Sequence, residues 1–290
     1  MTDRVSSWRL LAGNPVTVIS AVVLAAVAVI AVGAHWLAPH GVNDIDVPNA
    51  LQAPSGDHWF GTDELGRDVA SRVLVAIAAS MRVAVVSVAF AAVVGVTIGL
   101  LAGYRGGWLD TVLMRVVDVM FAFPVLLLAL AVVAVLGPGV TTTTLAIGIV
   151  YTPIFARVAR ASTLSVRAEP YVAVSKTMGT GDGYILSRHV LPNISGPLIV
   201  QTSLSLAFAT LSEAALSFLG LGIQPPQPSL GRMIFDSQGF VTLAWWMAVF
   251  PGVAIFVIVL AFNLLGDGLR DVLDPKQRTM IEARRTGARR

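Results

Sequence analysis

The sequence contains no cysteine and few charged residues, and both shortages narrow the classes of protein to which it can belong. Among its 290 residues there is no Cys, which excludes a disulfide framework, a zinc–thiolate site and an iron–sulfur cluster. Charged residues make up 13% of the chain, whereas an average soluble domain carries about 25%. Because hydrophobic residues make up 56%, a soluble fold would expose large apolar patches. The composition therefore excludes a soluble globular enzyme and a disordered chain, and it predicts a polytopic membrane protein.

Six long apolar stretches are each suited to form a membrane-spanning helix, which needs about 20 mostly apolar residues. The first stretch is longer than the roughly 7–15 apolar residues of a secretory signal peptide, so we expect it to remain as the first span. The six stretches are Val16–Leu37, Val83–Tyr104, Val112–Leu136, Val140–Ala156, Ile194–Gly222 and Leu243–Leu265.

Basic residues are concentrated on one side of the predicted bundle. If the N-terminal segment 1–15 is cytoplasmic, then 157–195 and 266–290 are cytoplasmic as well, and these segments hold most of the Lys and Arg residues. The positive-inside rule therefore predicts a multi-pass protein of the plasma membrane with both termini in the cytoplasm. We expect the basic tail to contact anionic membrane lipid. The extracytoplasmic loop 38–81 is acidic and rich in turn residues, and its part from Asp68 to Met81 is expected to form an interfacial helix before the second span.

The inner segment 157–195 is long for a connection between spans. Tyr171–Met178 has the spacing of a short helix, and Tyr184–Leu191 that of a second, amphipathic one that Pro192 ends. Two short helices around a glycine turn predict a knob that projects into the cytoplasm, where a groove of a soluble partner can receive it. The glycines of the turn are Gly179, Gly181 and Gly183.

The spacing of this segment resembles the cytoplasmic EAA loop of ABC importer permeases. That pattern reads Glu-Ala-Ala, three residues, Gly, nine residues, then Ile-x-Leu-Pro. Aligned on Gly179, the chain departs from it at the Glu position, which is Ala173, at the first Ala position, which is Val174, and at the Ile position, which is His189. The Leu-Pro end is retained. The resemblance implies an ATPase-coupling loop whose residues are Tyr171, Ala173, Ser175, Lys176, Gly179, Gly183, Arg188, His189, Leu191 and Pro192.

A second stretch, after the first span, resembles the Gly-Thr-Asp-x-x-Gly-Arg-Asp signature of the dipeptide, oligopeptide and nickel permeases, in the position that it has in their C-type subunits. Its residues are either a docking site for a substrate-binding protein or a self-stapled loop. In the second case Arg67 is held by Asp63 or Asp68 and the glycines supply positive φ. The extracytoplasmic motif consists of Gly61, Thr62, Asp63, Gly66, Arg67 and Asp68. Further agreement comes from Arg188–Asn193 and Glu213–Gly222.

The resemblance implies an all-α, six-helix permease of the type I ABC importer fold in the inner membrane, with five of its helices in a core over 82–265. It implies a second homologous permease subunit, two ABC ATPase subunits and an extracytoplasmic substrate-binding protein that delivers a di- or oligopeptide. The chain has no Gly-x-x-x-x-Gly-Lys-Ser/Thr loop, so ATP and Mg²⁺ are expected on the ATPases, and we expect this chain to bind no cofactor and to catalyse no reaction. The net charge of +3 is modest, and no nucleic acid partner is expected.

Two other functions remain open at this point. Nickel or another small solute of the same family is an alternative substrate. An ion-coupled secondary transporter is a less favoured alternative, because it needs an ion site near the midplane, commonly between inverted repeats, and the sequence contains no clear repeat.

Three ionisable residues fall inside predicted spans, where such residues are costly and are therefore functional candidates. Arg115 and Asp118 are three residues apart and share one face of a helix, which favours an internal ion pair near the inner boundary over a gating role. Glu213 has no partner nearby in the sequence. It is expected to hydrogen-bond across helices, with a place on the transport pathway as the alternative.

The histidine and tryptophan side chains are expected to have structural or interface roles. Metal ligation needs three or four convergent ligands, and the histidines are scattered along the sequence, so no metal site is expected. His189 is expected at the partner interface. Trp245 and Trp246 are expected to anchor the last span at the outer membrane interface. The histidines are His35, His40, His58 and His189.

Overall fold

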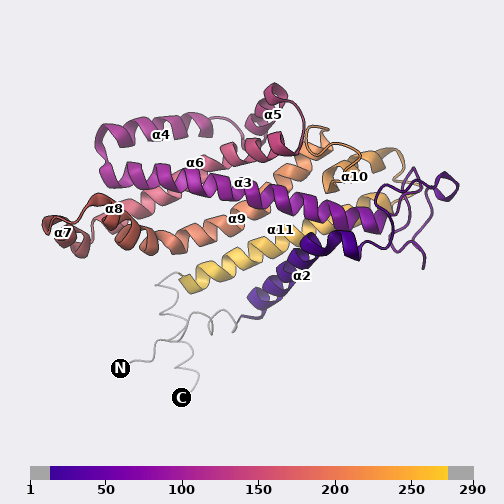
Figure 1. The fold of residues 1–290 in the computed structure, drawn as a ribbon, viewed down its shortest axis with the longest axis horizontal. Helices are drawn as coiled ribbons and strands as arrows, with labels where there is room; N and C mark the ends of the chain where they lie inside the picture. Colours follow the sequence, from indigo (N-terminus) through magenta and orange to yellow (C-terminus); the bar gives the residue numbers. More distant parts are fainter. Residues whose placement is uncertain (1–13, 274–290) are drawn as a thin grey trace, which may run out of the picture.

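Residues 14–273, described by a computed structural model, form an elongated bundle of α-helices (Figure 1). Within this range the β-type pairing is limited to one bridge between Thr62 and Asp68, and the predicted all-α class is confirmed. Five helices are long and apolar enough to cross a membrane, and a sixth candidate is a bent pair. The predictions for residues 1–13 and for the basic tail from residue 274 lie outside the described part.

The helices follow one another as predicted for the spans, with several additions. They are α2 (Pro15–Leu37), α3 (Val69–Arg105), α4 (Gly107–Phe121), α5 (Val125–Leu136), α6 (Val140–Arg167), α7 (Pro170–Thr177), α8 (Asp182–Ile185), α9 (Leu191–Phe218), α10 (Leu230–Asp236) and α11 (Trp246–Leu273). Two short 3₁₀ turns and one π-helical turn complete the secondary structure of this range.

The stretch expected to form one span over Val112–Leu136 is two helices. α4 and α5 meet at a bend of 91°. Pro124 begins α5 and has no N–H group to donate, and it disfavours the helical conformation at the preceding Phe123. The predicted span is therefore bent at its proline, and it is the sixth candidate span when α4 and α5 are taken together.

Helix α3 begins earlier than the predicted second span. The expected interfacial helix from Asp68 and the span from Val83 are one continuous helix of 37 residues, which is roughly 55 Å long. Its start is capped by the Asp68 carboxylate, which accepts a hydrogen bond from the Ser71 N–H. The loop expected over 38–81 therefore ends at residue 68.

Helices also continue further than predicted on both sides of the inner segment. α6 extends to Arg167, and the second short helix runs without interruption from Asp182 into α9, so Pro192 does not end it. The π-helical turn Leu186–Val190 lies directly before this proline, and the Leu191 N–H bonds to the Leu186 carbonyl, five residues back. A widened turn relieves the clash between a proline ring and the carbonyl four residues earlier. The described end of α11, Leu273, also lies beyond the predicted start of the tail at 266.

The tightest helix pair is α3 with α6, which pack along most of their lengths. Gly95, Gly99 and Gly103 recur every four residues on α3 and face the backbone of α6. A Cβ atom at Gly99 would lie 2.4 Å from the carbonyl oxygen of Ala156. Small residues at this spacing let two membrane helices approach closely, which holds α3 and α6 together as one unit.

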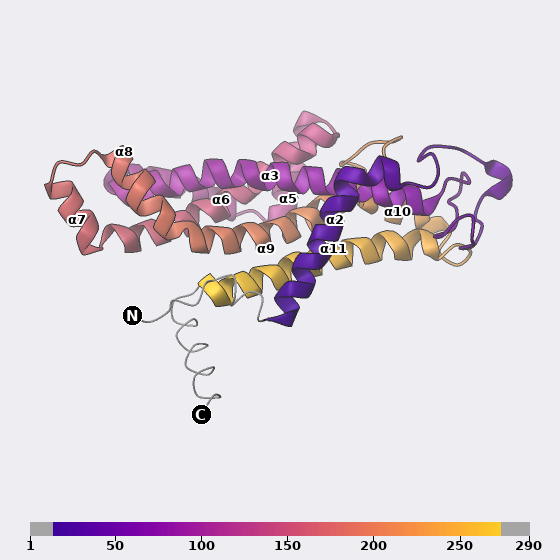
Figure 2. The same cartoon turned by 60° about the horizontal axis from the view of Figure 1, so that its bottom comes forward.

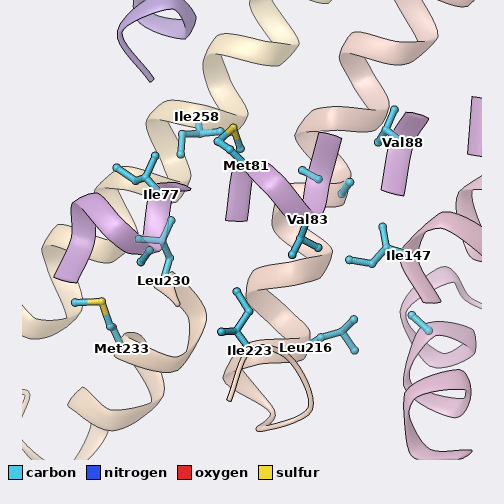
Figure 3. Packing of buried hydrophobic residues seen from close by; sticks show 14 of the residues in the cluster. Ile77, Met81, Val83, Val88, Ile147, Leu216, Ile223, Leu230, Met233 and Ile258 are labelled. Atoms are coloured by element: carbon cyan, nitrogen blue, oxygen red, sulfur yellow. The ribbon is translucent and has the colours of Figure 1, made fainter. Parts of the chain in front are cut away.

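The main apolar core lies where α3, α6, α9 and α11 meet (Figure 3). Figure 3 shows Val83 of α3 beside Leu216 of α9 and Ile147 of α6, while Met81 lies near Ile258 of α11. Helix α10, which the sequence analysis did not predict, closes this core at one end. Both Figures 1 and 2 place the α7–α8 region and the loop before α3 at opposite ends of the long axis. Figure 2 shows α2 crossing the bundle obliquely, against α3 and α11.

Candidate functional site

The segment between α6 and α9, residues 168–190, forms a helical knob at one end of the bundle (Figure 1). The predicted first helix of the knob is confirmed as α7, and Gly179 in the following turn has φ +78°, a value that favours glycine. The knob has a small apolar core of its own, separate from the main core. It consists of Tyr104, Ala159, Val172, Ile185, Val190 and Ile194.

Hydrogen bonds also attach the knob to α3 and α9. The Tyr104 hydroxyl donates to Asp182 Oδ1 at 2.9 Å, which ties the end of α3 to the start of α8. The Asn193 amide donates to the Tyr171 hydroxyl at 3.2 Å, which ties α9 back to α7. The sequence analysis missed Tyr104, because no local pattern signals a contact between residues 78 positions apart. Packing and hydrogen bonds together make the knob a fixed extension of α3, α6 and α9.

The outward face of the knob is apolar and aromatic. Met178 is 80% exposed, and Tyr184 and Val174 are each 56% exposed. His189 is half-buried between the rings of Tyr171 and Tyr184, with centroid distances of 6.0 and 5.7 Å. Several exposed apolar side chains on one short element are typical of a protein interface. The other predicted coupling residues lie in the knob or, for Leu191 and Pro192, at the start of α9. All are exposed except Ser175, which is half-buried: Ala173, Ser175, Lys176, Gly179, Gly183, Arg188, Leu191 and Pro192.

Ion pairs join α4 to α6 near the knob, and one of them corrects a prediction. Asp118 pairs with Arg157 of α6 at 2.7 Å rather than with Arg115, which is exposed, so the expected internal pair was wrong. Both partners of the observed pair are half-exposed, and exposed pairs contribute little to stability. Arg160 of α6 also donates two hydrogen bonds, of 2.5 and 2.6 Å, to the Asp110 carboxylate of α4. Local spacing suggested a partner three residues away, whereas helix packing supplied one from another helix.

At the opposite end, residues 38–68 form a loop that is held by its own side chains, here named the stapled loop. Asp63 Oδ1 accepts hydrogen bonds from the backbone N–H groups of Leu65 and Arg67, each at 2.9 Å. Its Oδ2 atom binds the Arg67 Nε at 2.6 Å. This is the self-stapled alternative considered for the motif, and the geometry confirms it. Arg67 also binds Glu64 at 3.0 Å, and burial raises the pKa of the Glu64 carboxyl, with the neighbouring Asp63 adding to the effect.

Two glycines of the motif are required by backbone geometry. Gly61 and Gly66 have φ values of +73° and +77°. A Cβ atom at Gly66 would lie 1.9 Å from the carbonyl oxygen of Asp46, and one at Gly61 would lie 2.5 Å from that of Gln52. The Thr62 hydroxyl completes the turn by donating to the Asn49 carbonyl at 2.6 Å. Close backbone approach therefore explains the glycines of the motif without any ligand.

The adjacent Trp245 and Trp246, at the start of α11, have different roles. Trp245 is half-exposed, as expected of an interface residue. Trp246 is 5% exposed and donates its indole N–H to the Thr62 carbonyl at 3.0 Å, across 184 residues of sequence. The expected role of Trp246 as a membrane-interface anchor was therefore wrong, since it instead fastens the stapled loop to the bundle.

Glu213 lies in the main core and is fully buried. The hydroxyls of Ser80 on α3 and Ser217 on α9 donate to its two carboxylate oxygens, at 2.5 and 2.7 Å. The expected hydrogen bond across helices is confirmed. Ser217 Oγ also accepts the Ile223 N–H, so this network joins α3, α9 and the chain after α9.

Two histidines that are far apart in the sequence come together beside Asp68. His58 Nδ1 lies 2.9 Å from Asp68 Oδ1, and His40 Nδ1 lies 3.7 Å from the same oxygen. The two imidazole rings are 4.7 Å apart. The description of the histidines as scattered is therefore wrong for this pair, because folding of the stapled loop returns the end of α2 to the start of α3.

Comparison with known families gives two matches. The model described as binding-protein-dependent transport system inner membrane component matches residues 95–279. The model described as N-terminal TM domain of oligopeptide transport permease C matches residues 5–54. Together they cover α2 and the chain from Gly95 in α3 to residue 279, including the knob.

Individual relatives agree with these matches over most of the chain. The dipeptide transport system permease protein DppC of Alkalihalophilus pseudofirmus is 42% identical, over 95% of this chain and 92% of its own length. The probable D,D-dipeptide transport system permease protein DdpC of Escherichia coli K12 is 43% identical over 92% and 90%. The glutathione transport system permease protein GsiD of Pectobacterium atrosepticum is 42% identical over 93% and 90%.

A solved structure shares the fold. A chain of the MetNI methionine ABC transporter, in an inward-facing conformation, superposes with a TM-score of 0.58 over 71% of this chain and 96% of that chain. The two sequences are 17% identical, so this likeness shows the fold alone. The helical bundle with its projecting knob is thus an ABC transporter permease fold.

Proposed function

Because the chain belongs to the family of binding-protein-dependent transport system inner membrane components, we propose that it is the permease subunit of an ATP-driven importer of di- or oligopeptides. The observation that carries the proposal is the knob, whose inner face is packed into the bundle and whose outer face is apolar and exposed. The peptide substrate is supported by relatives that are named for dipeptides and glutathione.

The proposal fixes an orientation and a set of partners. The knob faces the cytoplasm and docks on one of two ABC ATPase subunits, which hold ATP and Mg²⁺. In Figure 1, α2 runs from near the middle of the bundle toward the stapled loop, and α11 runs from the stapled-loop end toward the knob end. These directions, with the basic residues of the inner segments, support cytoplasmic termini. The stapled loop faces outward, where a substrate-binding protein delivers peptide, and a second homologous permease completes the pathway.

The knob transmits force because it is continuous with the bundle. α6 leads directly into it, and α8 continues through the π-helical turn into α9. A displacement imposed on the exposed face therefore moves α6 and α9, and the close glycine contact makes α3 move with α6. Such rigid-body shifts of packed helices alternate the access of a central pathway between the two sides. The chain itself performs no covalent chemistry in this scheme.

The proposal is tested by copurification of the ATPase subunits with the permease. The double variant Met178→Asp/Tyr184→Asp puts charge on the exposed face of the knob, so we expect it to lose the ATPases while remaining in the membrane. The matched control, Ile45→Asp/Trp59→Asp, changes two residues of the stapled loop that are 63% and 61% exposed. It is expected to retain the ATPases. Undiminished copurification with the knob variant contradicts the proposed docking surface.

A further inference from the structure

The stapled loop brings three potential metal ligands to one point. His40, His58 and Asp68 each offer a ligand atom, and these atoms all lie within 4.8 Å of one another. Two ligands of an ion with bonds of about 2.1 Å are separated by about 2.9–3.4 Å at angles between octahedral and tetrahedral. The 2.9 Å separation of His58 Nδ1 from Asp68 Oδ1 is in this range. His40 Nδ1, at 3.7 Å from the same oxygen, has to move closer to the other two ligands, and rotation of the His40 ring, which is 42% exposed, allows this. We propose that these three side chains bind a divalent transition metal ion of the zinc type.

The side chain of Asp68 is oriented for such a role. Its Oδ2 atom accepts hydrogen bonds from the Ser71 N–H at 2.8 Å and from the Ser71 hydroxyl at 2.7 Å. This leaves Oδ1 directed at the two imidazole rings. Hydrogen bonds that fix a ligating carboxylate are a regular feature of metal sites. Asp68 is buried, so its position does not depend on the ion.

The two histidines are held by their backbones. The His40 N–H donates to the same Ser71 hydroxyl at 3.0 Å, which places the end of α2 against the start of α3. The His58 N–H donates to Ser55 Oγ at 3.1 Å, and its carbonyl accepts the Gly61 N–H at 2.9 Å. Three segments that are separate in the sequence thus present their ligands from fixed positions, which lowers the cost of ordering them around an ion.

Space and charge around the three ligands also suit a cation. They line a cavity of about 260 Å³ together with Gly41, Asp44, Asp46 and Gly66. The cavity has room for water molecules that complete the coordination, and Asp44 and Asp46 add negative charge. Two imidazoles with a carboxylate favour zinc, copper or nickel over magnesium or calcium, which prefer oxygen ligands alone. The bound ion would join the end of α2, the stapled loop and the start of α3.

The proposal goes beyond transport and is tested without it. The full-length chain is purified through a histidine-free tag and dialysed against Zn²⁺ alone, and bound metal is counted by mass spectrometry. We expect one Zn²⁺ per chain, and a dissociation constant at least about tenfold higher for His40→Gln and for His58→Gln. The control His35→Gln changes an exposed histidine near the end of α2 and is expected to bind normally. Because His40 is held through its backbone, His40→Gln tests ligation without loosening the loop.

Three results would overturn the site. The first is equal zinc binding by the wild type and by the double variant His40→Gln/His58→Gln. The second is an X-ray absorption spectrum of the bound zinc without imidazole scattering. The third is displacement of zinc by equimolar Ca²⁺.

The proposed joining of the three segments by the ion, here called clamping, is tested separately by proteolysis. Zn²⁺ is expected to slow cleavage within residues 38–68 in the wild type but not in the double variant. Equal protection of both proteins contradicts the clamping.

Discussion

At the scale of single residues, the shape of the stapled loop depends on a few side chains that hydrogen-bond to the backbone or to other side chains. Asp63 fixes two backbone N–H groups and one guanidinium, and so determines the path of the chain from residue 63 to 67. Trp246 performs the corresponding task over a long range, because its indole N–H reaches the carbonyl next to Asp63. The loop is therefore held internally by Asp63, and it is fastened to the bundle by Trp246 and by Ser71 and Arg72 of α3, which bind the His40 N–H and the Val42 carbonyl.

Replacing Trp246 with Phe tests its attachment of the loop to the bundle. The variant leaves the Thr62 carbonyl without its buried donor, which is expected to cost about 1–3 kcal/mol. Faster proteolysis of the stapled loop, at an unchanged rate of cleavage elsewhere, is the measurement. The control is Trp245→Phe, which changes a half-exposed neighbour and is expected to have no effect. Equal cleavage rates for the two variants would show that the indole hydrogen bond does not hold the loop.

The partly buried carboxyl of Glu64 predicts that the stability of the folded loop depends on pH. Burial raises its pKa in the folded loop, so the protonated form is favoured by folding. The resulting stabilisation is fully present below the unfolded pKa of about 4.3 and is lost as the pH rises through the folded pKa. Glu64→Gln removes this dependence, and its thermal stability relative to the wild type is expected to increase with pH between pH 4 and pH 7. Asp57→Asn, at an exposed carboxyl of the same loop, serves as the control. A stability difference that stays constant over this range contradicts the assignment.

At the scale of elements, prolines and glycines determine where helices bend and how closely they pack. Pro124 separates α4 from α5, yet Pro192 lies inside a continuous helix because a π-helical turn precedes it. Pro124 was expected inside a single span and Pro192 at the end of a short helix, whereas the structure has a sharp bend at Pro124 and a continuous helix through Pro192. The difference depends on hydrogen bonds of the preceding turn, which local sequence patterns do not specify.

The glycine contact between α3 and α6 is the second prediction at this scale. In Gly99→Ala the added Cβ meets the Ala156 carbonyl at 2.4 Å, so α6 must move away from α3. Overpacking of this kind typically costs about 1–3 kcal/mol, and we expect a lower apparent Tm in detergent. Gly252→Ala in α11 is the control, because nothing lies within 4 Å of its added methyl group. A Tm of Gly99→Ala at or above that of Gly252→Ala would show that the helices do not need their close approach.

At the scale of the whole molecule, the sequence predicts the class and the approximate spans, and long-range contacts account for most errors. Apolar stretches give five of the spans, and spacing around Gly179 gives the knob. Tyr104, Trp246 and His40 acquire their roles from partners that only folding brings near. The same applies to Asp118, whose partner is on another helix. The spacing of residue types along the sequence predicts helices, whereas the pairing of side chains across the bundle depends on how the helices pack.

In the proposed function, the two ends of the bundle have different tasks. A fixed knob at one end receives force, and a stapled loop at the other end presents a surface of defined shape. Because long helices connect the two ends, a displacement of the knob moves these helices toward the other end of the bundle as well. In the proposed function, the work comes from ATPases that dock on the knob.

The most direct test of this division of tasks is peptide uptake into vesicles that contain both permeases, with and without the ATPase subunits. The account predicts uptake of a labelled dipeptide, delivered by its binding protein, only when the ATPases and ATP are both present on the knob side. Competition by longer peptides and by nickel chelates in the same assay identifies the substrate class. Accumulation of peptide by vesicles without ATPases, driven by an ion gradient, would contradict the central claim.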